Sequence, residues 1–368
     1  MRIASYNVEN LYSRARALNG DMAAGVNPVL DHFAELNALI DKPNYAPADK
    51  ARMLELLTAL DLEESDTGDF VILRQNRGHF VKRPRAGGIE IIANGRSDWV
   101  GWIELRTEAV NERALLHTAD VVRDVNADIF ATIEAENRIA LKRFSETLLL
   151  GEGGAPYRHI MLIDGNDERG IDVGVMTREG FEIGEIRSHV DELKPDGEPI
   201  FSRDCPEFAI TTPQGNRVWL LVNHFKSKVG NPRTANAKRK VQAERVAKIY
   251  QGLRAAGQAN VAIVGDLNDT PASEPLAPLL ATDLKDVSTL ANFDDGGFPG
   301  TYGGSTAGNK IDYILLSPAL QAKATGGGIF RMGMWPGVRP KKWPVYQTLT
   351  KEVEAASDHG AIFVDLDF

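Results

Sequence analysis

Hydrophobic residues fall mainly in short runs along the chain, and these runs predict more strands than helices. The alternation in IASYNV, residues 3–8, predicts a first strand. Later apolar runs predict strands at DIFATI (128–133), DVGVMT (172–177), FAITT (208–212), VWLLVNHF (218–225), NVAIVGD (260–266), KIDYILL (310–316) and AIFVDLDF (361–368).

Helical spacing occurs between several of these strands. One helix is predicted before residue 128, with Leu115, Ala119 and Val122 on one face. Another is predicted near 233–254, where the residues that share a face are Val246, Ile249, Tyr250 and Leu253. Strands that outnumber helices, with helices between them, predict an α/β protein with two packed sheets flanked by helices.

The segment 13–115 has a pattern of its own. Apolar residues at helical spacing predict two helices, with Val29, Phe33, Leu36 and Ile40 on the first and Met53, Leu54, Leu57 and Leu60 on the second. Short β-prone runs follow at DFVILR (69–74), HFVKR (79–83), IEIIA (89–93) and DWVGWIEL (98–105). We therefore expect an insertion at 13–115, made of a helical pair and a small β-rich segment.

Composition narrows the class of protein. The chain is 43% hydrophobic and 25% charged, which is typical of a globular protein with a large core. Its single cysteine, Cys205, excludes an intrachain disulfide and a cysteine-based zinc site. No apolar run approaches the ~20 residues of a membrane span. The start of the sequence has no secretory signal, so we expect a cytoplasmic location. The net charge of −9 disfavours tight nonspecific binding of duplex nucleic acid.

Several predicted strands run directly into acidic, amide or imidazole side chains. Four segments have this form: VEN (8–10), TIEAEN (132–137), VNHFKS (222–227) and VGDLND (264–269). Two more, KIDYILL and ASDHGAIFV (356–364), place an acid among apolar residues. Oxygen ligands without thiolates favour Mg²⁺ or Mn²⁺ over zinc. Phosphate hydrolysis needs a cation, a base for water and hydrogen-bond donors, and these segments contain all three.

In this order, SYNVEN, IEAEN, NHFKSK, GDLNDTP, IDYILLSP and SDH resemble the endonuclease/exonuclease/phosphatase superfamily. The wording of NHFKSK and GDLNDTP is most similar to bacterial branches classed as nucleases. The resemblance covers residues 1–10 and roughly 118–368. It implies a four-layer α/β sandwich of the deoxyribonuclease I type, with two mixed sheets face to face. It also implies a single catalytic domain over 1–368, interrupted by the insertion.

The resemblance implies a metal site and a principal ligand. Asn7 and Glu134 match the positions at which the family holds its metal, with Glu134 as the principal ligand, and Asp358 matches a metal-associated carboxylate. One bound Mg²⁺ or Mn²⁺ is the expectation, and a second ion stays open.

The resemblance also implies catalytic roles. Asp266 and Asn268 orient the attacking water and the phosphate, and His224 contacts the scissile phosphate or assists the leaving group. Asp312 holds His359 in one tautomer. The expected reaction is in-line attack by metal-assisted water, with His359 stabilising the pentacovalent phosphate. Whether Asp266 or His359 removes the water proton stays open.

Residues near these motifs have competing interpretations. Arg169, Asp172 and Lys226 are candidate substrate contacts, although a salt bridge explains Arg169 and Asp172 equally well and solvent exposure explains Lys226. Arg203 is a weaker candidate of the same kind. Other polar residues have the following interpretations: Glu9 is either an acid beside the metal site or a surface acid, Glu136 is a helix-start acid, Asp269 and Thr270 cap the turn after the strand, and His32, His79, His117, His159 and His189 are surface or core residues without strand-end acids.

Basic stretches bear on the substrate. Residues 226–248 are rich in Lys and Arg, and residues 339–342 read RPKK beside Trp335 and Trp343. They suit a nucleic-acid strand, but a solvated helix face with a Glu244–Lys248 pair is the simpler interpretation. The insertion adds further cations and aromatic residues that are candidates for choosing the substrate: Arg74, Arg77, Lys82, Arg83, Arg85, Trp99 and Trp102.

Three functions therefore stay open. The first is a nuclease for DNA or RNA, which the motifs and the basic helix favour. The second is a phosphatase or phosphodiesterase for a small or lipid-derived phosphoester, which the acidic net charge and the insertion favour. The third is a noncatalytic binding module that keeps the fold, which the complete ligand set disfavours. The expected partner is a phosphoester substrate, with nucleic acid as one candidate, and the oligomeric state is open.

Overall fold

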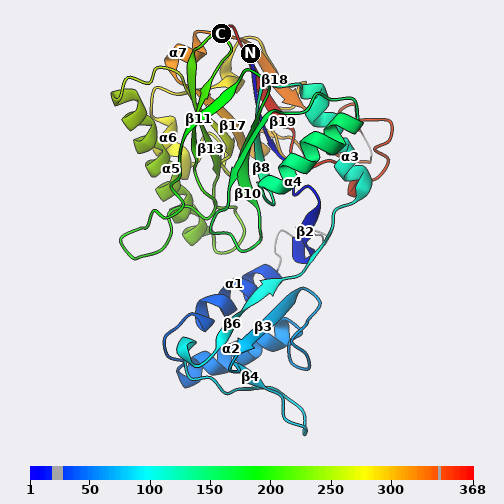
Figure 1. The fold of residues 1–368 in the computed structure, drawn as a ribbon, viewed down its shortest axis with the longest axis vertical. Helices are drawn as coiled ribbons and strands as arrows, with labels where there is room; N and C mark the ends of the chain where they lie inside the picture. The colour runs from blue at the N-terminus through cyan, green and yellow to red at the C-terminus, as the bar shows by residue number, and fades with distance from the viewer. Residues whose placement is uncertain (19–27, 339–340) are drawn as a thin grey trace. The chain divides into compact units, whose positions relative to one another are not determined.

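The computed structural model describes residues 1–18, 28–338 and 341–368. The chain forms two compact units, one of Met1–Tyr12 with Val110–Phe368 and the other of Ser13–Ala109 (Figure 1). Each of the hydrophobic clusters lies wholly within one unit. In the described residues, no helix is long and apolar enough to cross a membrane.

Two mixed β-sheets form the centre of the larger unit. The first has the order β16 (Phe293–Asp294), β18 (Ala324–Phe330), β19 (Ala361–Leu366), β1 (Arg2–Asn7), β8 (Ile129–Ala135), β10 (Asp172–Thr177) and β9 (His159–Ile163). The second has the order β11 (Glu182–Arg187), β12 (Glu207–Thr211), β13 (Arg217–His224), β14 (Val261–Asp266), β17 (Asp312–Leu316) and β15 (Lys285–Asp286). Strand β1 pairs in parallel with β8, and β13 with β14, whereas β8 and β10 are antiparallel.

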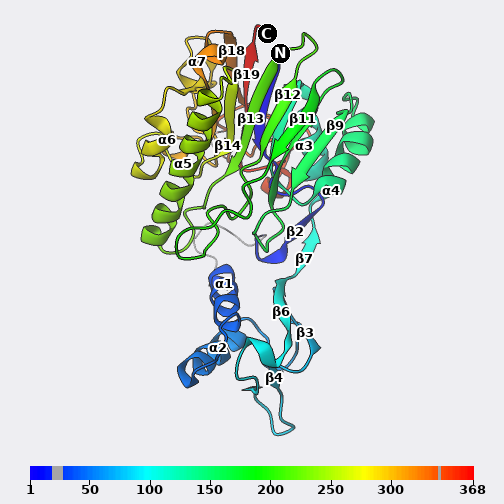
Figure 2. The same cartoon turned by 60° about the vertical axis from the view of Figure 1, so that its left-hand side comes forward.

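The sheets pack face to face and helices cover their outer faces, as Figure 2 shows. Ile3 and Ile129 of one sheet share a core cluster with Val218 and Val264 of the other. On one outer face, α3 (Glu112–Val125) and α4 (Arg138–Arg143) cover the first sheet. On the other, α5 (Pro232–Ala255) covers the second sheet with the predicted residues, Val246, Ile249, Tyr250 and Leu253. The predicted four-layer α/β sandwich is confirmed.

Local sequence explains where the covering helices begin and end. The Asn111 side chain accepts the N–H groups of Arg113 and Ala114 and caps α3, and Asn126, directly after the helix, has left-handed backbone. Asn231 caps α5, and Pro232 occupies its first turn. Shorter elements complete the unit: α6 (Ala277–Leu280), α7 (Pro318–Gln321), a π-helical turn (Phe144–Leu149) and 3₁₀ turns at Glu274–Leu276, Val287–Thr289, Ala307–Asn309 and Glu352–Glu354.

The smaller unit has its own core. Two helices, α1 (Pro28–Ile40) and α2 (Pro47–Ala59), pack with three strand pairs. The pairs are β2 (Ser13–Ala15) with β7 (Thr107–Ala109), β3 (Val71–Arg77) with β6 (Val100–Leu105), and β4 (Val81–Lys82) with β5 (Glu90–Ile91); 3₁₀ turns lie at Arg16–Leu18 and Arg96–Asp98. The unit ends at Ala109 rather than at residue 115, because α3 begins at Glu112 and packs in the larger unit.

Candidate active site

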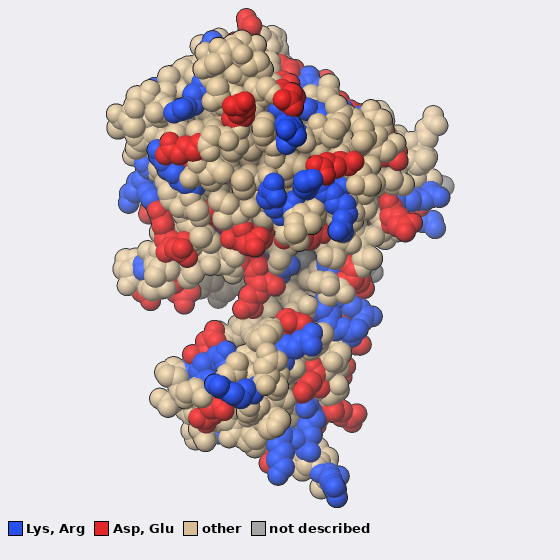
Figure 3. All heavy atoms as spheres, viewed as in Figure 1, with Lys and Arg blue, Asp and Glu red and all other residues tan. Residues whose placement is uncertain are grey.

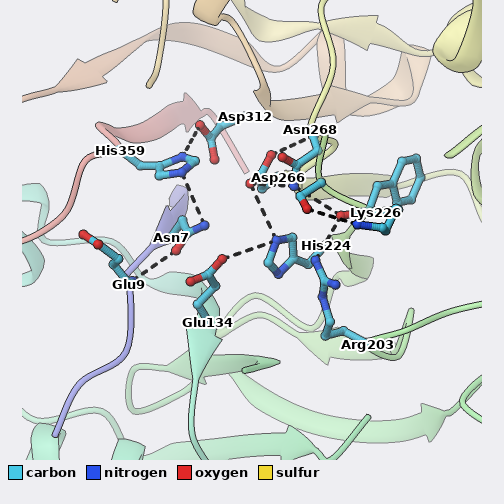
Figure 4. A network of polar contacts seen from close by, with 12 residues as sticks. Asn7, Glu9, Glu134, Arg203, His224, Lys226, Asp266, Asn268, Asp312 and His359 are labelled. Atoms are coloured by element: carbon cyan, nitrogen blue, oxygen red, sulfur yellow. Dashed lines mark hydrogen bonds and ion pairs between the residues drawn. The ribbon is translucent and has the colours of Figure 1, made fainter. Parts of the chain in front are cut away.

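Three neighbouring strands of the second sheet carry ionisable side chains at one edge. His224 ends β13, Asp266 ends β14 and Asp312 begins β17. The register pairs His224 with Asp266, and Asp266 with Asp312. Directly paired residues project from the same face of a sheet, so the three side chains point the same way. All three are buried, and Figure 4 shows them meeting residues from the first sheet.

His359, which precedes β19, is bound to Asp312. Nδ1 of His359 lies 2.8 Å from Oδ2 of Asp312. Burial lowers the pKa of the imidazole, but the charge and hydrogen bond of Asp312 and the charge of Asp358 outweigh it, so the pKa lies well above its ordinary value. The ring is therefore cationic at neutral pH. Its other nitrogen, Nε2, lies 3.5 Å from the Asn7 amide nitrogen and 3.6 Å from Oδ1 of Asp358.

His224 is held in the neutral form. Burial, followed by the positive charges of Arg203 and Arg169, holds its pKa well below the ordinary value. Nε2 lies 3.5 Å from Oε1 of Glu134 and 3.7 Å from Oδ2 of Asp266. Two carboxylates beside Nε2 favour the single proton at that nitrogen, which leaves the buried Nδ1 as an acceptor.

Asp266 lies between the histidines and is fixed by Asn268. Its Oδ1 accepts the backbone N–H of Asn268 at 2.7 Å, and its Oδ2 accepts the side-chain amide at 3.1 Å. Asn268 has φ 54°, which asparagine tolerates better than most residues. Burial, followed by the negative charge of Asp312, raises the pKa of Asp266 to about 8, although His359 lowers it. Asp312 and Glu134 therefore place further negative charge beside a carboxylate that burial already raises in pKa.

Glu134 lies in strained backbone at the end of β8. Its φ is 63°, and the pairing of β8 with β10 shifts register between Asp172 and Val173 at this point. A bulge redirects the side chain of the strand that carries it, and such strain is concentrated at functional sites. The Glu134 side chain is 19% exposed, so it is accessible from the site.

Residues from both ends of the chain complete the candidate site, with Asn7 and Glu9 near the N-terminus and Asp358 near the C-terminus. Asn7 ends β1, and its Oδ1 accepts the backbone N–H of Glu9 at 3.1 Å. The Glu9 carboxylate accepts the backbone N–H of Asp358 at 3.3 Å and so joins the two ends of the chain. Of the two interpretations of Glu9, an acid beside the site is therefore the one that its contacts support.

Each of the three predicted substrate residues has a partner within the protein. Arg169 forms a two-pronged bond with Asp167 at 2.8 and 2.6 Å, so its salt-bridge interpretation is right in part. Asp172 accepts the N–H of Gly165 at 2.7 Å, and burial raises its pKa to about 7. Lys226 donates to the Val229 carbonyl at 3.0 Å, and burial and Arg169 lower its pKa to about 8.

Two further residues lie beside the site, Arg203, which the sequence indicated only weakly, and Tyr302, which it did not indicate. Arg203 is 1% exposed, bonds Asp167 at 3.0 Å and donates to the Phe225 carbonyl at 3.0 Å, while its Nε makes no hydrogen bond with any described residue. Tyr302 lies with its ring 4.9 Å from that of His359. The Gly-rich sequence around Tyr302 contains no motif that indicates an active-site residue. Arg203 could be found from the sequence, because it lies in SRDCPEF, which leads into a predicted strand.

Two predictions about charged residues were wrong. Glu136 is not a helix-start acid, because Asn137 caps α4 and the Glu136 carboxylate accepts the N–H groups of Leu11 and Tyr12. His189 does have acidic partners: its ring nitrogens lie 2.8 Å from Glu192 and 2.8 Å from Glu207. Glu192 lies three residues after His189, whereas Glu207 begins β12 and meets the ring only in the folded chain.

Three of the basic residues of α5 pair with acids of the same unit. Arg239 is buried and pairs with Asp269 at 3.1 Å, Arg245 pairs with Glu192, and Lys240 pairs with Glu274. Asp269 also accepts the N–H of Thr270, as expected of a capping residue. The expected Glu244–Lys248 ion pair does not form in the described part of the chain. Of RPKK, residues 339–340 lie outside the described residues, and the adjacent Trp343 is core, with Nε1 donating to the Met334 carbonyl.

Comparisons with known proteins agree with this fold. A family model, the Endonuclease/Exonuclease/phosphatase family, matches residues 84–324, more than half of the chain. No curated protein matches significantly. A mannosyl-6-phosphatase structure from Bacteroides thetaiotaomicron has 18% identity and a TM-score of 0.51, covering 70% of this chain and 91% of that chain.

Two further solved structures are similar. Truncated TDP2 from Caenorhabditis elegans has 16% identity and a TM-score of 0.48, covering 69% of this chain and 89% of that chain. The human Nocturnin catalytic domain has 16% identity and a TM-score of 0.48, covering 71% and 88%. The family match, with the strand-end residues that meet in the larger unit, shows that the chain belongs to the endonuclease/exonuclease/phosphatase family and is a hydrolase of phosphoester bonds.

Proposed function

We propose that the chain hydrolyses phosphodiester bonds with the help of Mg²⁺ or Mn²⁺ and that its substrate is DNA or RNA. The observation that carries the proposal is the pair of buried histidines, one neutral and one cationic, beside Asp266. Environments that move the pKa values of two titratable groups apart assign them different roles in proton transfer and charge stabilisation.

In the proposed reaction, Asp266 and Asn268 orient the attacking water and the phosphate. Asn268 fixes the Asp266 carboxylate with two hydrogen bonds, so little reorganisation is needed when water binds. Neutral His224, 3.7 Å from Asp266, contacts the scissile phosphate or assists the leaving group. Of the two candidates for removing the water proton, Asp266 and His359, we propose Asp266, because His359 is already protonated at neutral pH.

Cationic His359 is proposed to stabilise the pentacovalent phosphate. Because Nδ1 is bound to Asp312, the nitrogen that would donate to a nonbridging oxygen is Nε2, whose neighbours at 3.5 and 3.6 Å are Asn7 and Asp358. Preorganised donors of this kind stabilise the charge that develops in the transition state. Asp312 acts on the reaction only through the ring and is a positioning residue.

Asn7, Glu134 and Asp358 are the proposed metal residues, with Glu134 as the principal ligand. Their donors are carboxylate and amide oxygens, which hard divalent ions prefer. Burial raises the pKa of Asp266, and the negative charges of Asp312 and Glu134 add to it; a bound cation would offset these charges, which supports the same conclusion. When bound, the ion would supply neutralisation of phosphate charge and acidification of water.

Arg169 and Lys226 are the proposed substrate contacts, since both place positive charge near His224. Asp172 contributes to this group through its bond to Gly165, which holds the loop that leads to Arg169. We further propose that Ser13–Ala109 is an insertion into a single catalytic domain, because the chain leaves the larger unit after Tyr12 and returns to it at Val110.

A small or lipid-derived phosphoester is the second candidate substrate. The net charge of −9 favours it, because polyanions are bound mainly through cations. The internal pairing of Arg239, Lys240 and Arg245 also weakens the case for α5 as a nucleic-acid contact. The noncatalytic alternative receives no support, because side chains from all six motifs gather at the site.

The test is a side-by-side assay of plasmid DNA, single-stranded RNA and bis-p-nitrophenyl phosphate with Mg²⁺, Mn²⁺ or EDTA. Cutting of either polymer that EDTA abolishes is the expected result. Hydrolysis of the small ester alone would favour the second candidate. Activity that persists in EDTA would contradict the metal requirement, whichever substrate is cut.

A further inference from the structure

The smaller unit carries a basic segment that the proposed reaction does not use. Residues 70–89 contain five Lys and Arg residues and no acid. Arg74 pairs with Glu104 and Arg83 with Asp66, whereas Arg77, Lys82 and Arg85 form no ion pair with any described residue. These last three are exposed. Figure 3 shows Lys and Arg gathered over the end of this unit that holds β4.

The β3–β6 pair presents an aromatic ring beside these cations. Its register pairs Arg74 with Trp102 and Arg77 with Val100. Paired residues project from the same face, so each of these two cations on β3 lies beside an apolar side chain on β6. Val100 is 41% exposed and Trp102 is 46% exposed, which is unusual for a large aromatic residue in an ordered strand.

The fold gives its two nearby tryptophans different roles. Trp99 is 2% exposed, stacks on Phe80 with centroids 4.7 Å apart and belongs to the core of the unit. Trp102 projects outward, and its Nε1 donates to Glu104 Oε2 at 2.9 Å. Because Glu104 holds the indole by its edge, the ring orientation is set before any partner arrives.

The loop between β4 and β5 extends the basic surface. It carries Arg83 and Arg85 and turns at Gly87 and Gly88, which have φ 94° and 83°. A Cβ added at either glycine would meet no atom within 4 Å, so the turn stands clear of the rest of the described structure. Cations on a loop of this kind can follow an irregular anionic chain more easily than a fixed helix face can.

We propose that the outer face of β3–β6, with the β4–β5 loop, binds single-stranded nucleic acid. A base stacks on Trp102, and phosphates pair with Arg77, Lys82 and Arg85. A duplex would use the cations but would leave the indole without a partner, whereas an unpaired base offers it a π-face. The proposal rests on the proposed nuclease function and deepens it by naming the class of nucleic acid.

The first experiment measures binding by the full-length protein in EDTA, using fluorescence anisotropy. The probes are a labelled 12-residue oligo(dT), an abasic strand of the same length and a 12-base-pair duplex. Trp102→Ala should weaken oligo(dT) binding roughly tenfold and leave abasic binding unchanged. Ile92→Ala, which removes a side chain 44% exposed in the same unit, is the matched control and should change neither.

The second experiment neutralises the cations together. Arg77→Gln, Lys82→Gln and Arg85→Gln should reduce the salt dependence of oligo(dT) binding, lowering the slope of log affinity against log salt by about 2. The matched control carries Arg158→Gln, Lys248→Gln and Lys285→Gln on the larger unit. Hydrolysis of bis-p-nitrophenyl phosphate, measured separately, should be the same in all variants, so a failed binding site and an inactive enzyme give different results.

Unchanged oligo(dT) affinity in Trp102→Ala would overturn the proposal. So would tighter binding of the duplex than of the single strand, or an equal loss of affinity in the two triple variants. Equal binding of abasic and base-containing strands by the unsubstituted protein would overturn the stacking contact and with it the choice of a single strand.

Discussion

His224 and His359 lie in the same buried site, yet their pKa values move in opposite directions. Burial lowers the pKa of both rings. The positive charges of Arg203 and Arg169 lower that of His224 further, whereas Asp312 and Asp358 raise that of His359. The neighbouring charges therefore account for the difference between the two buried histidines. This is the feature from which the roles in the proposed reaction follow.

His359→Ala should reduce turnover by about 10²- to 10⁴-fold, because it removes the donor proposed for the transition state. Loss of the ring leaves the buried Asp312 carboxylate without its hydrogen-bond partner, so the variant should be less stable but still folded at the assay temperature. Turnover of bis-p-nitrophenyl phosphate measures the loss of activity, and the circular dichroism spectrum shows whether the variant is folded. A rate within a few-fold of the unsubstituted enzyme would remove His359 from the mechanism.

Glu134→Gln should raise the Mg²⁺ or Mn²⁺ concentration needed for half-maximal activity, because it replaces an anionic ligand with a neutral one. Titration of activity against metal measures the shift. Glu136→Gln is a suitable control, since Glu136 binds the backbone of Leu11 and Tyr12 instead. An unchanged metal dependence would mean that another residue is the principal ligand.

At the scale of single elements, the loop 188–206 connects β11 to β12 and is held in place by hydrogen bonds to acidic side chains. His189 lies between Glu192 and Glu207, its backbone N–H donates to Asp204 at 2.7 Å, and Arg245 binds Glu192. Arg187 lies 3.5 Å from Glu207. The segment contains Arg203, so these contacts also hold the stretch of chain that carries this arginine to the candidate site.

This segment should make stability depend on pH. Burial lowers the pKa of His189, but bonds to Glu207 and Glu192 raise it more, so the net pKa is raised. Glu192 stays ionised, because Arg245 first and then His189 lower its pKa to about 2. The stabilisation is thus complete below the unfolded pKa of about 6.5 and is lost as pH rises through the higher folded value.

His189→Gln should therefore lower the free energy of unfolding at pH 6 more than at pH 9. Urea unfolding at both pH values measures the difference. His159→Gln is the control, since no carboxylate lies within ion-pair distance of His159 in the described residues. An equal loss at pH 6 and pH 9 would show that His189 acts by packing rather than by charge.

Apolar runs predicted the central strands well, but they missed β9, β11 and β18. Strand β18, ATGGGIF, has glycines where neighbouring strands lie close: a Cβ on Gly327 would fall 2.6 Å from the Phe363 carbonyl oxygen. Glycine runs indicate turns in sequence, so only the tertiary contact explains this strand. The motif order likewise predicted which residues converge, but partners such as Asp167 with Arg203 or Glu207 with His189 depend on the fold.

At the scale of the whole molecule, the two units have separate hydrophobic cores and are connected by two chain segments that lie side by side. Ser13 pairs with Ala109 in β2–β7, and the Val110 N–H donates to the Tyr12 carbonyl at 3.0 Å. The points where the chain leaves and re-enters the larger unit are therefore neighbours. No hydrophobic cluster of the described residues mixes the two units.

Replacing Ser13–Ala109 with a Gly-Gly linker should therefore leave the larger unit folded, because the linker spans only the gap between Tyr12 and Val110. Hydrolysis of bis-p-nitrophenyl phosphate should stay within a few-fold of the full chain, since the site residues all belong to the larger unit. Oligo(dT) binding and polymer cutting should fall together. A folded variant that cuts single strands as fast as the full chain would show that the smaller unit has no part in substrate choice, and a variant that folds but loses small-ester hydrolysis would place part of the active site in Ser13–Ala109.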